Sequence, residues 1–327
     1  MTIEIRELDP HEPGTDAVLL PVLRAASAVD SPRHPEANEA WVHYINGPRI
    51  ARHRTALVAF DGAEAVGYGL LNQDLESNQD MVYGDIWIRP EHRADTTVPL
   101  VDAFKAYTRS RGGKRLVSVF SELAVSDYEQ VFAAEGGRLV SREWRSQLDL
   151  RAIDRERYAA WAAPSEKNAH YRIEYWVTPT PEHLLEAMVR ANEAMRDAPT
   201  GDLAFEYPPP SVDRRRRAEA LSVASGERKH VVAALTDDGV VAGFHELYAA
   251  PGFGMADVGN TGVPAGFRGH GLGLRLKADL ALRLAAAEPE IETVSTWNGA
   301  DNEPMLRVNE ALGYERAEAW SNWQFDL

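Results

Sequence analysis

The chain repeats itself at an offset of 175–177 residues, and this repeat constrains the fold more than any other feature. Thr55–Leu71 and Val231–Leu247 each contain two β-rich runs joined by an Asp-Gly turn, the pattern of a β-hairpin. Other landmarks keep the same spacing: Gly62 and Gly239, Gly67 and Gly243, Arg93 and Arg268, Gly136 and Gly313. We therefore predict a tandem duplication of one α/β unit.

Each half is predicted to be a twisted, mixed β-sheet flanked by helices, because β-rich runs alternate with helical patterns. The length of 327 residues suits two domains. We place the first in residues 1–150, a polar linker in 151–169 and the second domain in 170–327. Besides the hairpins, strands are expected at 2–7, 81–88, 115–120, 171–177, 255–263 and 291–296, and helices at 98–111, 126–134, 181–195, 212–225, 271–287 and 302–311.

The amino-acid composition excludes or disfavours several classes of function. With 35 basic and 50 acidic residues the net charge is -15, which disfavours nucleic-acid binding and suits a small cationic substrate. Cysteine is absent, which excludes disulfides, thiolate metal sites and a thiol nucleophile. No run approaches the roughly 18 apolar residues of a membrane span, and MTIEIRELDP lacks the pattern of a secretory signal. We expect a cytoplasmic monomer or homodimer with no membrane partner and no metal.

The segment TGVPAGFRGHGLGLRLKA, Thr261–Ala278, carries the most chemical information. A β-rich run ends at Val263, and a glycine-rich turn then leads into a helix with leucines at i, i+4 spacing. Glycines let the backbone approach a ligand, and the free amides of the first helical turn favour an anion. The turn is therefore predicted to hold a phosphate or pyrophosphate; tight strand-to-helix packing is the alternative. A Walker loop and a Rossmann turn do not fit, since Gly-Lys-Ser/Thr is absent and the turn follows the fourth strand of its repeat.

This segment resembles the acetyl-CoA signature of the GCN5-related N-acetyltransferases (GNAT family), in which Arg or Gln is followed by spaced glycines. The later segment TWNGADNEPMLRVNEALGY, Thr296–Tyr314, resembles the second signature of that family, in which an Asn opens a helix that ends in Leu-Gly-Tyr. The order of elements in both halves is similar to that of the tandem, two-domain members. The resemblance implies two tandem GNAT-type domains, acetyl-CoA as co-substrate and an N-acetyltransferase activity.

The resemblance also implies roles for the matching positions. Gly262 and Val263 would pair with the pantetheine arm, and a backbone N–H near Val263 would polarise the thioester carbonyl. Asn302 would contact the CoA arm with Met305 beside it, although Asn302 also fits a plain helix N-cap. The full predicted cofactor set is Thr261, Gly262, Val263, Arg268, Gly269, His270, Gly271, Leu272, Gly273, Leu274, Asn302 and Met305.

Only the second half is predicted to bind the cofactor. At the equivalent positions of the first half, Gly271 and Gly273 are replaced by Thr96 and Val98, and Asn302 by Val125. β-Branched residues crowd a pyrophosphate and resist a positive φ. We therefore expect one acetyl-CoA per chain and a degenerate first domain.

Three polar residues are candidates for catalysis. Asp257, six residues before Val263, occupies the strand position where the histone-acetylating members carry a glutamate base, and Glu246 ends the hairpin strand before it. Either carboxylate would accept the proton of the attacking amine, or would instead be solvated or paired with Arg. Asn309 occupies the position where many family members carry a tyrosine that protonates the leaving CoA thiolate. An amide can hydrogen-bond the thiolate sulfur, but it cannot donate a proton as an acid.

We expect acetyl transfer to a primary amine on a small molecule, by direct attack in a ternary complex; a protein amine ranks second. The alternative is an acyl-CoA-binding regulatory module with little or no catalysis, which Asn309 favours. The long loop Asp197–Pro210 is either a lid or a surface loop, and its Asp197 and Asp202 would suit a cationic substrate or simple turn chemistry. His245 and the arginine run Arg214–Arg217 are expected at the surface.

Overall fold

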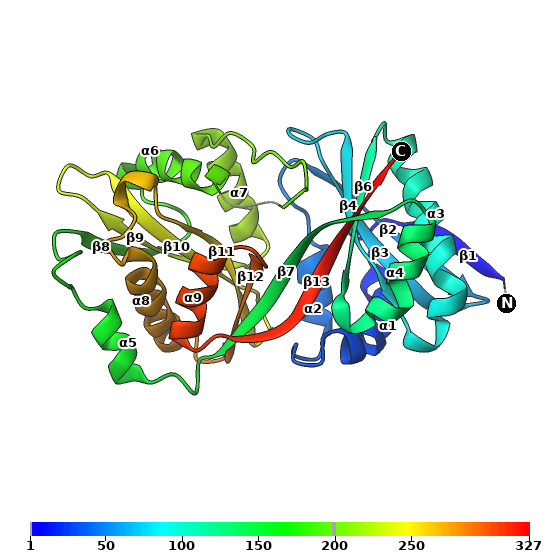
Figure 1. Cartoon of the computed structure of the whole chain (residues 1–327), viewed down its shortest axis with the longest axis horizontal. Coiled ribbons are helices and arrows are strands. Elements are labelled where there is room, and N and C mark those ends of the chain that lie inside the picture. The colour runs from blue at the N-terminus through cyan, green and yellow to red at the C-terminus, as the bar shows by residue number, and fades with distance from the viewer. Residues whose placement is uncertain (1, 198–200) are drawn as a thin grey trace. The chain divides into compact units, whose positions relative to one another are not determined.

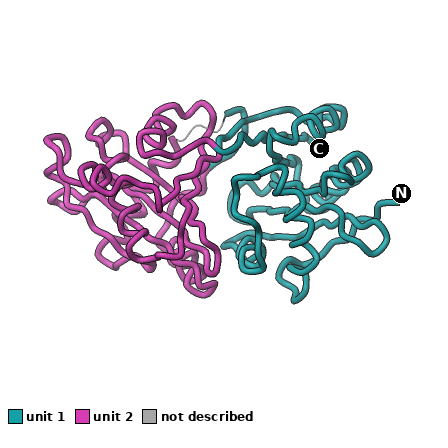
Figure 2. Tube along the Cα trace, turned by 90° about the horizontal axis from the view of Figure 1, so that it is seen from below, with its two compact units in different colours: residues 1–144, 200–206, 317–327 teal, residues 145–199, 207–316 magenta. Residues whose placement is uncertain are grey.

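The computed structural model describes residues 2–197 and 201–327, which form two compact units (Figure 2). Unit 1 contains Met1–Trp144, Thr200–Glu206 and Ala317–Leu327, and unit 2 contains Arg145–Pro199 and Tyr207–Arg316. Each unit is a mixed β-sheet with helices packed against it (Figure 1). The predicted fold class is therefore confirmed.

The sheet of unit 1 begins with an antiparallel meander. Its strands β1 (Ile3–Leu8), β2 (Arg52–Asp61), β3 (Glu64–Asp74) and β4 (Met81–Asp85) pair in chain order. Strand β6 (Arg115–Ser121) then adds in parallel to β4. The other elements are α1 (Thr15–Asp30), α2 (Glu39–Asn46), the short strand β5 (Trp87–Ile88), the 3-10 turns η1 (Pro90–His92) and η2 (Glu122–Ala124), α3 (Arg93–Ser110) and α4 (Val125–Ala134).

The sheet of unit 2 repeats this pairing order. Strands β8 (Arg172–Val177), β9 (Arg228–Leu235), β10 (Val241–Ala249) and β11 (Met255–Gly262) are antiparallel, and β12 (Thr293–Gly299) pairs in parallel with β11. The remaining elements are α5 (Arg155–Ala162), α6 (Glu182–Ala191), η3 (Asn192–Asp197), α7 (Val212–Ala224), η4 (Ala265–Phe267), α8 (Leu272–Ala287) and α9 (Glu303–Leu312). The shared strand order and direction show that the two halves are copies of one unit.

The unit boundaries differ from the predicted domain boundaries at the end of the chain. The last strand, β13 (Glu315–Asp326), pairs with β6 along Trp320–Asp326 and so completes the sheet of unit 1. Strand β7 (Arg138–Asp149) also crosses from one unit to the other. The physical reason is strand pairing: β6 has an open edge, and β13 supplies its backbone hydrogen bonds.

Two cores cover the two faces of the sheet in unit 2. On one face Leu276, Leu280 and Leu284 of α8 pack against strands β9 to β12, together with Tyr158 of α5. On the other face Leu184 and Met188 of α6 pack against Val231 and Phe244. Figure 1 shows α6 and α7 opposite α8 and α5 across the strands.

Within the described residues, no helix is both long and apolar enough to cross a bilayer.

Candidate functional site

The glycine-rich turn of unit 2 has the backbone geometry that its glycines permit. Gly269 and Gly271 have φ of 83° and 74°, in the left-handed region, and Gly271 caps the N-terminus of α8. No side chain caps α8 and its first turn holds no acidic residue, whereas Asp154, Ser211 and Asn302 cap α5, α7 and α9. A Cβ added at Gly273 would meet no described atom within 4 Å. The turn therefore offers free amides beside open space, which is the arrangement that binds an anion.

The predicted linker supports this turn. Helix α5 lies within it and packs against α8, and Asn168 is buried. The Asn168 amide donates to the carbonyl of His270 at 3.1 Å, and Arg275 of α8 donates to the carbonyl of Asn168 at 2.7 Å. The Tyr171 hydroxyl lies 2.6 Å from Nδ1 of His270. These contacts are not predictable from the sequence, because a polar, proline-containing segment has the pattern of a linker.

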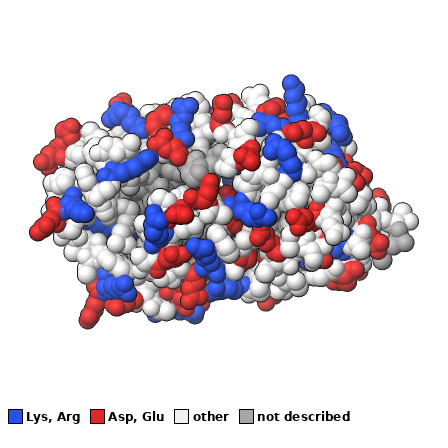
Figure 3. All heavy atoms as spheres, viewed as in Figure 1, with Lys and Arg blue, Asp and Glu red and all other residues white. Residues whose placement is uncertain are grey.

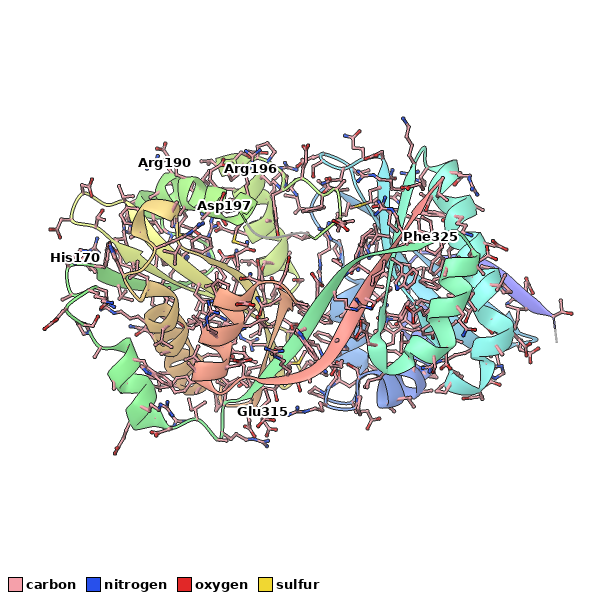
Figure 4. The ribbon with its side chains drawn as sticks, viewed as in Figure 1. His170, Arg190, Arg196, Asp197, Glu315 and Phe325 are labelled. Carbon is pink, nitrogen blue, oxygen red and sulfur yellow. The ribbon has the colours of Figure 1, made fainter. Side chains whose placement is uncertain are left out.

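Arg268 is exposed and is held by the protein itself. Its guanidinium donates to the carbonyl of Val263 at 3.0 Å and forms an ion pair with Asp197 at 2.7 Å. Figure 4 shows Asp197 and Arg196 at the end of the α6–η3 segment. Asp197 is thus neutralised by Arg268, and Asp202 belongs to unit 1, so the two acidic loop residues are not gathered around a cation site within one unit. The rest of the predicted loop lies partly outside the described residues, at 198–200.

The equivalent segment of unit 1 has a different structure. Helix α3 begins at Arg93 after His92, whose φ is -107°, so the left-handed cap is missing. Arg93 is buried and pairs with Asp30 at 2.5 Å and Asp127 at 2.7 Å, and Thr96 is fully buried. Unit 1 therefore has a buried, ion-paired arginine in place of the exposed Arg268, and it lacks the left-handed glycine turn.

Strands β11 and β12 pair only at their beginnings. Their parallel register runs from Met255 with Thr293 to Asp257 with Ser295, although β11 continues to Gly262. The antiparallel register with β10 also shifts: His245 faces Thr261 and Leu247 faces Val258, so Gly259 and Asn260 bulge opposite Glu246. The bulge lies on the part of β11 beyond its pairing with β12, where its backbone groups are available to a ligand.

The two candidate bases have different surroundings. Burial raises the pKa of the Asp257 carboxyl to about 6, although Arg145 and Ser295 oppose the shift. Glu246 is 1 % exposed and forms ion pairs with Arg215 at 3.2 Å and Lys229 at 3.5 Å. Glu246 therefore adopts the arginine-paired alternative, and Asp257 is the carboxylate with a pKa suited to accepting a proton near neutrality.

The second predicted signature forms the end of β12 and the whole of α9. The Asn302 side chain accepts a hydrogen bond from the Met305 amide at 3.4 Å, which is the N-cap geometry. Asn309 is 1 % exposed and donates to Oδ1 of Asn298 in β12 at 2.7 Å. Its own Oδ1 has no hydrogen-bond partner among the described residues, so it keeps an acceptor for a ligand.

A pocket of about 210 Å³ opens on the α6 and α7 face of unit 2. Its walls come from α6, η3, the segment Tyr207–Ser211, α7 and strands β9 to β11. Asn260 of the bulge and Glu246 opposite it both line this pocket. Tyr248 lines it too and is the direct cross-strand neighbour of Asp257, so both side chains lie on the same face of the sheet.

Two buried polar residues, His245 on β10 and Lys277 on α8, were not predicted to be buried. His245 was expected at the surface but is only 1 % exposed. Its Nδ1 lies 2.8 Å from the Thr261 hydroxyl oxygen. Burial, and to a smaller extent the nearby charge of Lys277, lowers the pKa of His245. Lys277 is 2 % exposed, its Nζ has no hydrogen-bond partner among the described residues, and the ring of Tyr314 lies 5.2 Å away. Burial lowers the pKa of Lys277 to about 7.

Within residues 2–197 and 201–327, no group of three or more His, Asp or Glu side chains is arranged to hold a metal ion.

Solved structures place this arrangement in a known class of fold: the chain has the fold of tandem GCN5-related N-acetyltransferases over its whole length. A tandem GNAT protein from the clavulanic acid biosynthesis pathway, solved without AcCoA, is 24% identical with a TM-score of 0.79, covering 99% of this chain and 98% of that one. A GCN5-related N-acetyltransferase from Sphaerobacter thermophilus is 17% identical with a TM-score of 0.71, covering 99% and 95%. The predicted resemblance is thus confirmed at the level of the fold.

Structures with lower sequence identity have a similar fold. A GNAT-family acetyltransferase from Colwellia psychrerythraea is 13% identical with a TM-score of 0.57, covering 98% of this chain and 99% of that chain. No family model and no curated protein sequence matches the chain.

Proposed function

We propose that the protein is an N-acetyltransferase that moves an acetyl group from acetyl-CoA to a primary amine on a small molecule, in unit 2. The glycine-lined start of α8 carries this proposal: two glycines with positive φ precede α8, whereas α3 of unit 1 follows His92 without that geometry and begins with the ion-paired Arg93. The fold of the structural neighbours supports acetyl transfer as the general chemistry.

In this proposal the backbone of Arg268–Leu274 holds the pyrophosphate of acetyl-CoA through the amides and dipole of the helix start. Thr261 and Gly262 lie on the part of β11 that has separated from β12, and Val263 follows directly after it; these three residues would bind the pantetheine arm. Asn302 and Met305 would flank that arm at the start of α9. A free amide near the bulge would polarise the thioester carbonyl.

The reaction is a direct acyl transfer. The amine nitrogen attacks the thioester carbon, the N–C bond forms, the C–S bond breaks, and the amine gives up one proton while the CoA thiolate gains one. Asp257 is proposed to accept the amine proton, directly or through water, because a pKa of about 6 leaves it mostly ionised at neutral pH. The second N–H of the Asn309 amide would donate a hydrogen bond to the thiolate sulfur without protonating it, so the proton comes from another source.

A non-catalytic acyl-CoA sensor is the second candidate, and one observation favours it. Asn309 is an amide fixed by Asn298 at the position where the related enzymes carry their acid. A sensor would bind acetyl-CoA but release no CoA thiol above background with any amine. An assay of thiol release over a panel of amines, with mass spectrometry of the products, separates the two functions.

The cofactor site is tested by Gly273→Glu. This glycine has an ordinary φ and open space at its Cβ position, so the substitution adds a negative charge to the anion site without backbone strain. We expect calorimetry to show one acetyl-CoA per chain for the wild type and at least a tenfold weaker affinity for Gly273→Glu, with an unchanged melting temperature.

Gly273→Ala is the matched control for that experiment and should retain most of the affinity. Undiminished binding by Gly273→Glu, or two equivalent acetyl-CoA sites in the wild type, would contradict the proposed site.

A further inference from the structure

A row of four polar side chains crosses the sheet of unit 2 beside the pocket. Tyr248 of β10 pairs with Lys229 of β9 on one side and with Asp257 of β11 on the other, and Asp257 pairs with Ser295 of β12. Residues that lie directly opposite each other on adjacent strands share one face of a sheet. The proposed base Asp257 therefore has Tyr248 as its neighbour on the face where the pocket opens.

The same row in unit 1 lacks this pair of groups. The equivalent registers pair Asn72 of β3 with Arg54 of β2 and with Tyr83 of β4. An amide thus occupies the position of Tyr248, and it accepts a hydrogen bond from Arg54 at 2.7 Å. A phenol occupies the position of the Asp257 carboxylate. The combination of a hydroxyl on the third strand and a carboxylate on the fourth belongs to the unit proposed to bind acetyl-CoA.

The Tyr248 ring lies directly on the bulge of β11. A Cβ added to Gly259 would be 2.2 Å from Cε2 and 3.2 Å from Cζ of this ring, so the ring occupies the space that a side chain at residue 259 would need. Cζ carries the hydroxyl, which therefore lies beside the backbone proposed to polarise the thioester carbonyl. No described residue forms a hydrogen bond with this hydroxyl. It is available to a ligand at the bulge.

The leaving thiolate needs a proton, and other polar groups are less well placed to give it. Charged side chains of both signs are mixed over the face of the molecule drawn in Figure 3, so surface charge singles out no donor. Glu246 is held in ion pairs with Arg215 and Lys229. Strand β10, which carries Tyr248, separates Lys229 on β9 from the bulge on β11. Tyr248 is thus the donor nearest to the bulge on this face.

The charges around Tyr248 suit a proton donor. Burial raises the pKa of its hydroxyl, Lys229 opposes this shift and Glu246 adds to it, so the group is protonated at neutral pH. The Lys229 ammonium lies 5.3 Å from the centre of the Tyr248 ring. This positive charge would stabilise the tyrosinate that remains after the proton has left.

We propose that Tyr248 donates the proton to the leaving CoA thiolate and so supplies the acid that Asn309 cannot provide. The proposal rests on the proposed acetyl transfer and completes its proton balance. When the C–S bond breaks, its electron pair stays on sulfur; the O–H bond of Tyr248 then breaks and an S–H bond forms. The tyrosinate takes a proton from water, and Asp257 releases the proton of the amine to solvent.

Tyr248→Phe tests this role, because it removes the hydroxyl and keeps the ring on Gly259. We expect an unchanged melting temperature, a kcat for CoA release that is lower by about tenfold or more, and a KM for acetyl-CoA that is little changed. Tyr175→Phe is the matched control and should keep the wild-type kcat, since it removes a hydroxyl on β8 that lies 2.8 Å from Nδ1 of His230. A folded Tyr248→Phe with wild-type kcat would overturn the proposal.

The selenium analogue of acetyl-CoA gives a readout that a merely structural role would not move. A selenol is much more acidic than a thiol, so a selenolate leaves without a proton while the rest of the carrier is unchanged. The loss of kcat in Tyr248→Phe should therefore be large with the thioester and small with the selenoester. An equal loss with both carriers would show that Tyr248 does not protonate the leaving group.

A measurement without turnover separates this proposal from the proposed function. In the complex with CoA, a hydrogen bond from Tyr248 to sulfur should make the pKa of the CoA thiol lower than in the complex of Tyr248→Phe. NMR of CoA with an isotope-labelled carbon next to sulfur follows this titration. If no amine supports CoA release, the proposed function fails, while a lower thiol pKa in the wild type still supports the contact with sulfur. Equal thiol pKa values in the two complexes would overturn that contact.

Discussion

At the residue scale, burial decides which polar side chains matter in unit 2. In the sequence, Glu246 and Asp257 are equal candidates for the base, since both are strand carboxylates near the glycine-rich turn. The structure separates them: Glu246 is neutralised by Arg215 and Lys229, while burial raises the pKa of Asp257 to about 6. His245 and Lys277 could not be identified from sequence, because an isolated His or Lys is by default a surface residue and only tertiary packing reveals otherwise.

Lys277 gives a prediction about stability. A buried ammonium without a hydrogen-bond partner opposes folding, so we expect Lys277→Met to raise the free energy of unfolding at pH 7 by about 1–3 kcal/mol. Burial lowers the pKa of Lys277 from 10.5 to about 7, so the unfolded chain binds more protons between these values. Wild-type stability should therefore rise with pH across this window, and the advantage of Lys277→Met should shrink.

Urea denaturation of both proteins at pH 7 and pH 9.5 measures this difference. The groups that face Lys277 are His245 of β10 and the Tyr314 ring. The pKa of His245 is lowered well below its usual value, and the pKa of Tyr314 is raised. Neither group therefore changes charge between pH 7 and pH 9.5. A Lys277→Met protein that is less stable than wild type at both pH values would refute the prediction.

At the element scale, helix α8 depends on a segment that the sequence presented as a linker. The alternation of strands and helices, and the glycine spacing, were enough to predict α8 and its turn. They gave no indication that residues 155–168 would pack against α8, because the polar side chains there point outward and the contacts are made by Asn168 and Tyr158. Support for a site by a distant backbone segment leaves no local sequence pattern.

Asn168→Ala tests this dependence. The substitution removes the donor to the His270 carbonyl, and loss of such a buried hydrogen bond costs about 1–3 kcal/mol. We expect the turn to loosen and the affinity for acetyl-CoA, measured by calorimetry, to fall several-fold. Asn192→Ala, which removes a local hydrogen bond to the Met188 carbonyl on the other face, is the comparison and should leave the affinity unchanged.

At the scale of the whole molecule, the repeat predicted two similar units but not how the chain is divided between them. The pattern of Glu315–Asp326 identifies a strand, yet a strand does not encode which sheet edge it joins. Pairing with β6 places Trp320, Trp323 and Phe325 in unit 1, where Phe325 is 1 % exposed beside Phe132. The predicted second domain, 170–327, follows the sequence repeat, whereas the folded unit 2 ends at Arg316.

Phe325→Ala should destabilise unit 1 although it lies at the end of the second repeat. Removing a buried phenylalanine costs about 3–5 kcal/mol. We expect hydrogen exchange to accelerate in β6 and α4 and to stay unchanged in α8. Leu284→Ala, in the core of unit 2, should give the reverse pattern. Faster exchange confined to unit 2 in Phe325→Ala would contradict the assignment of β13.

The position of β13 also has a consequence for synthesis of the protein. The ribosome makes the first half long before the last strand, so during translation β6 waits with an open edge for a partner about 200 residues further along the chain. The nascent first half must therefore keep one sheet edge unpaired until β13 has been synthesised.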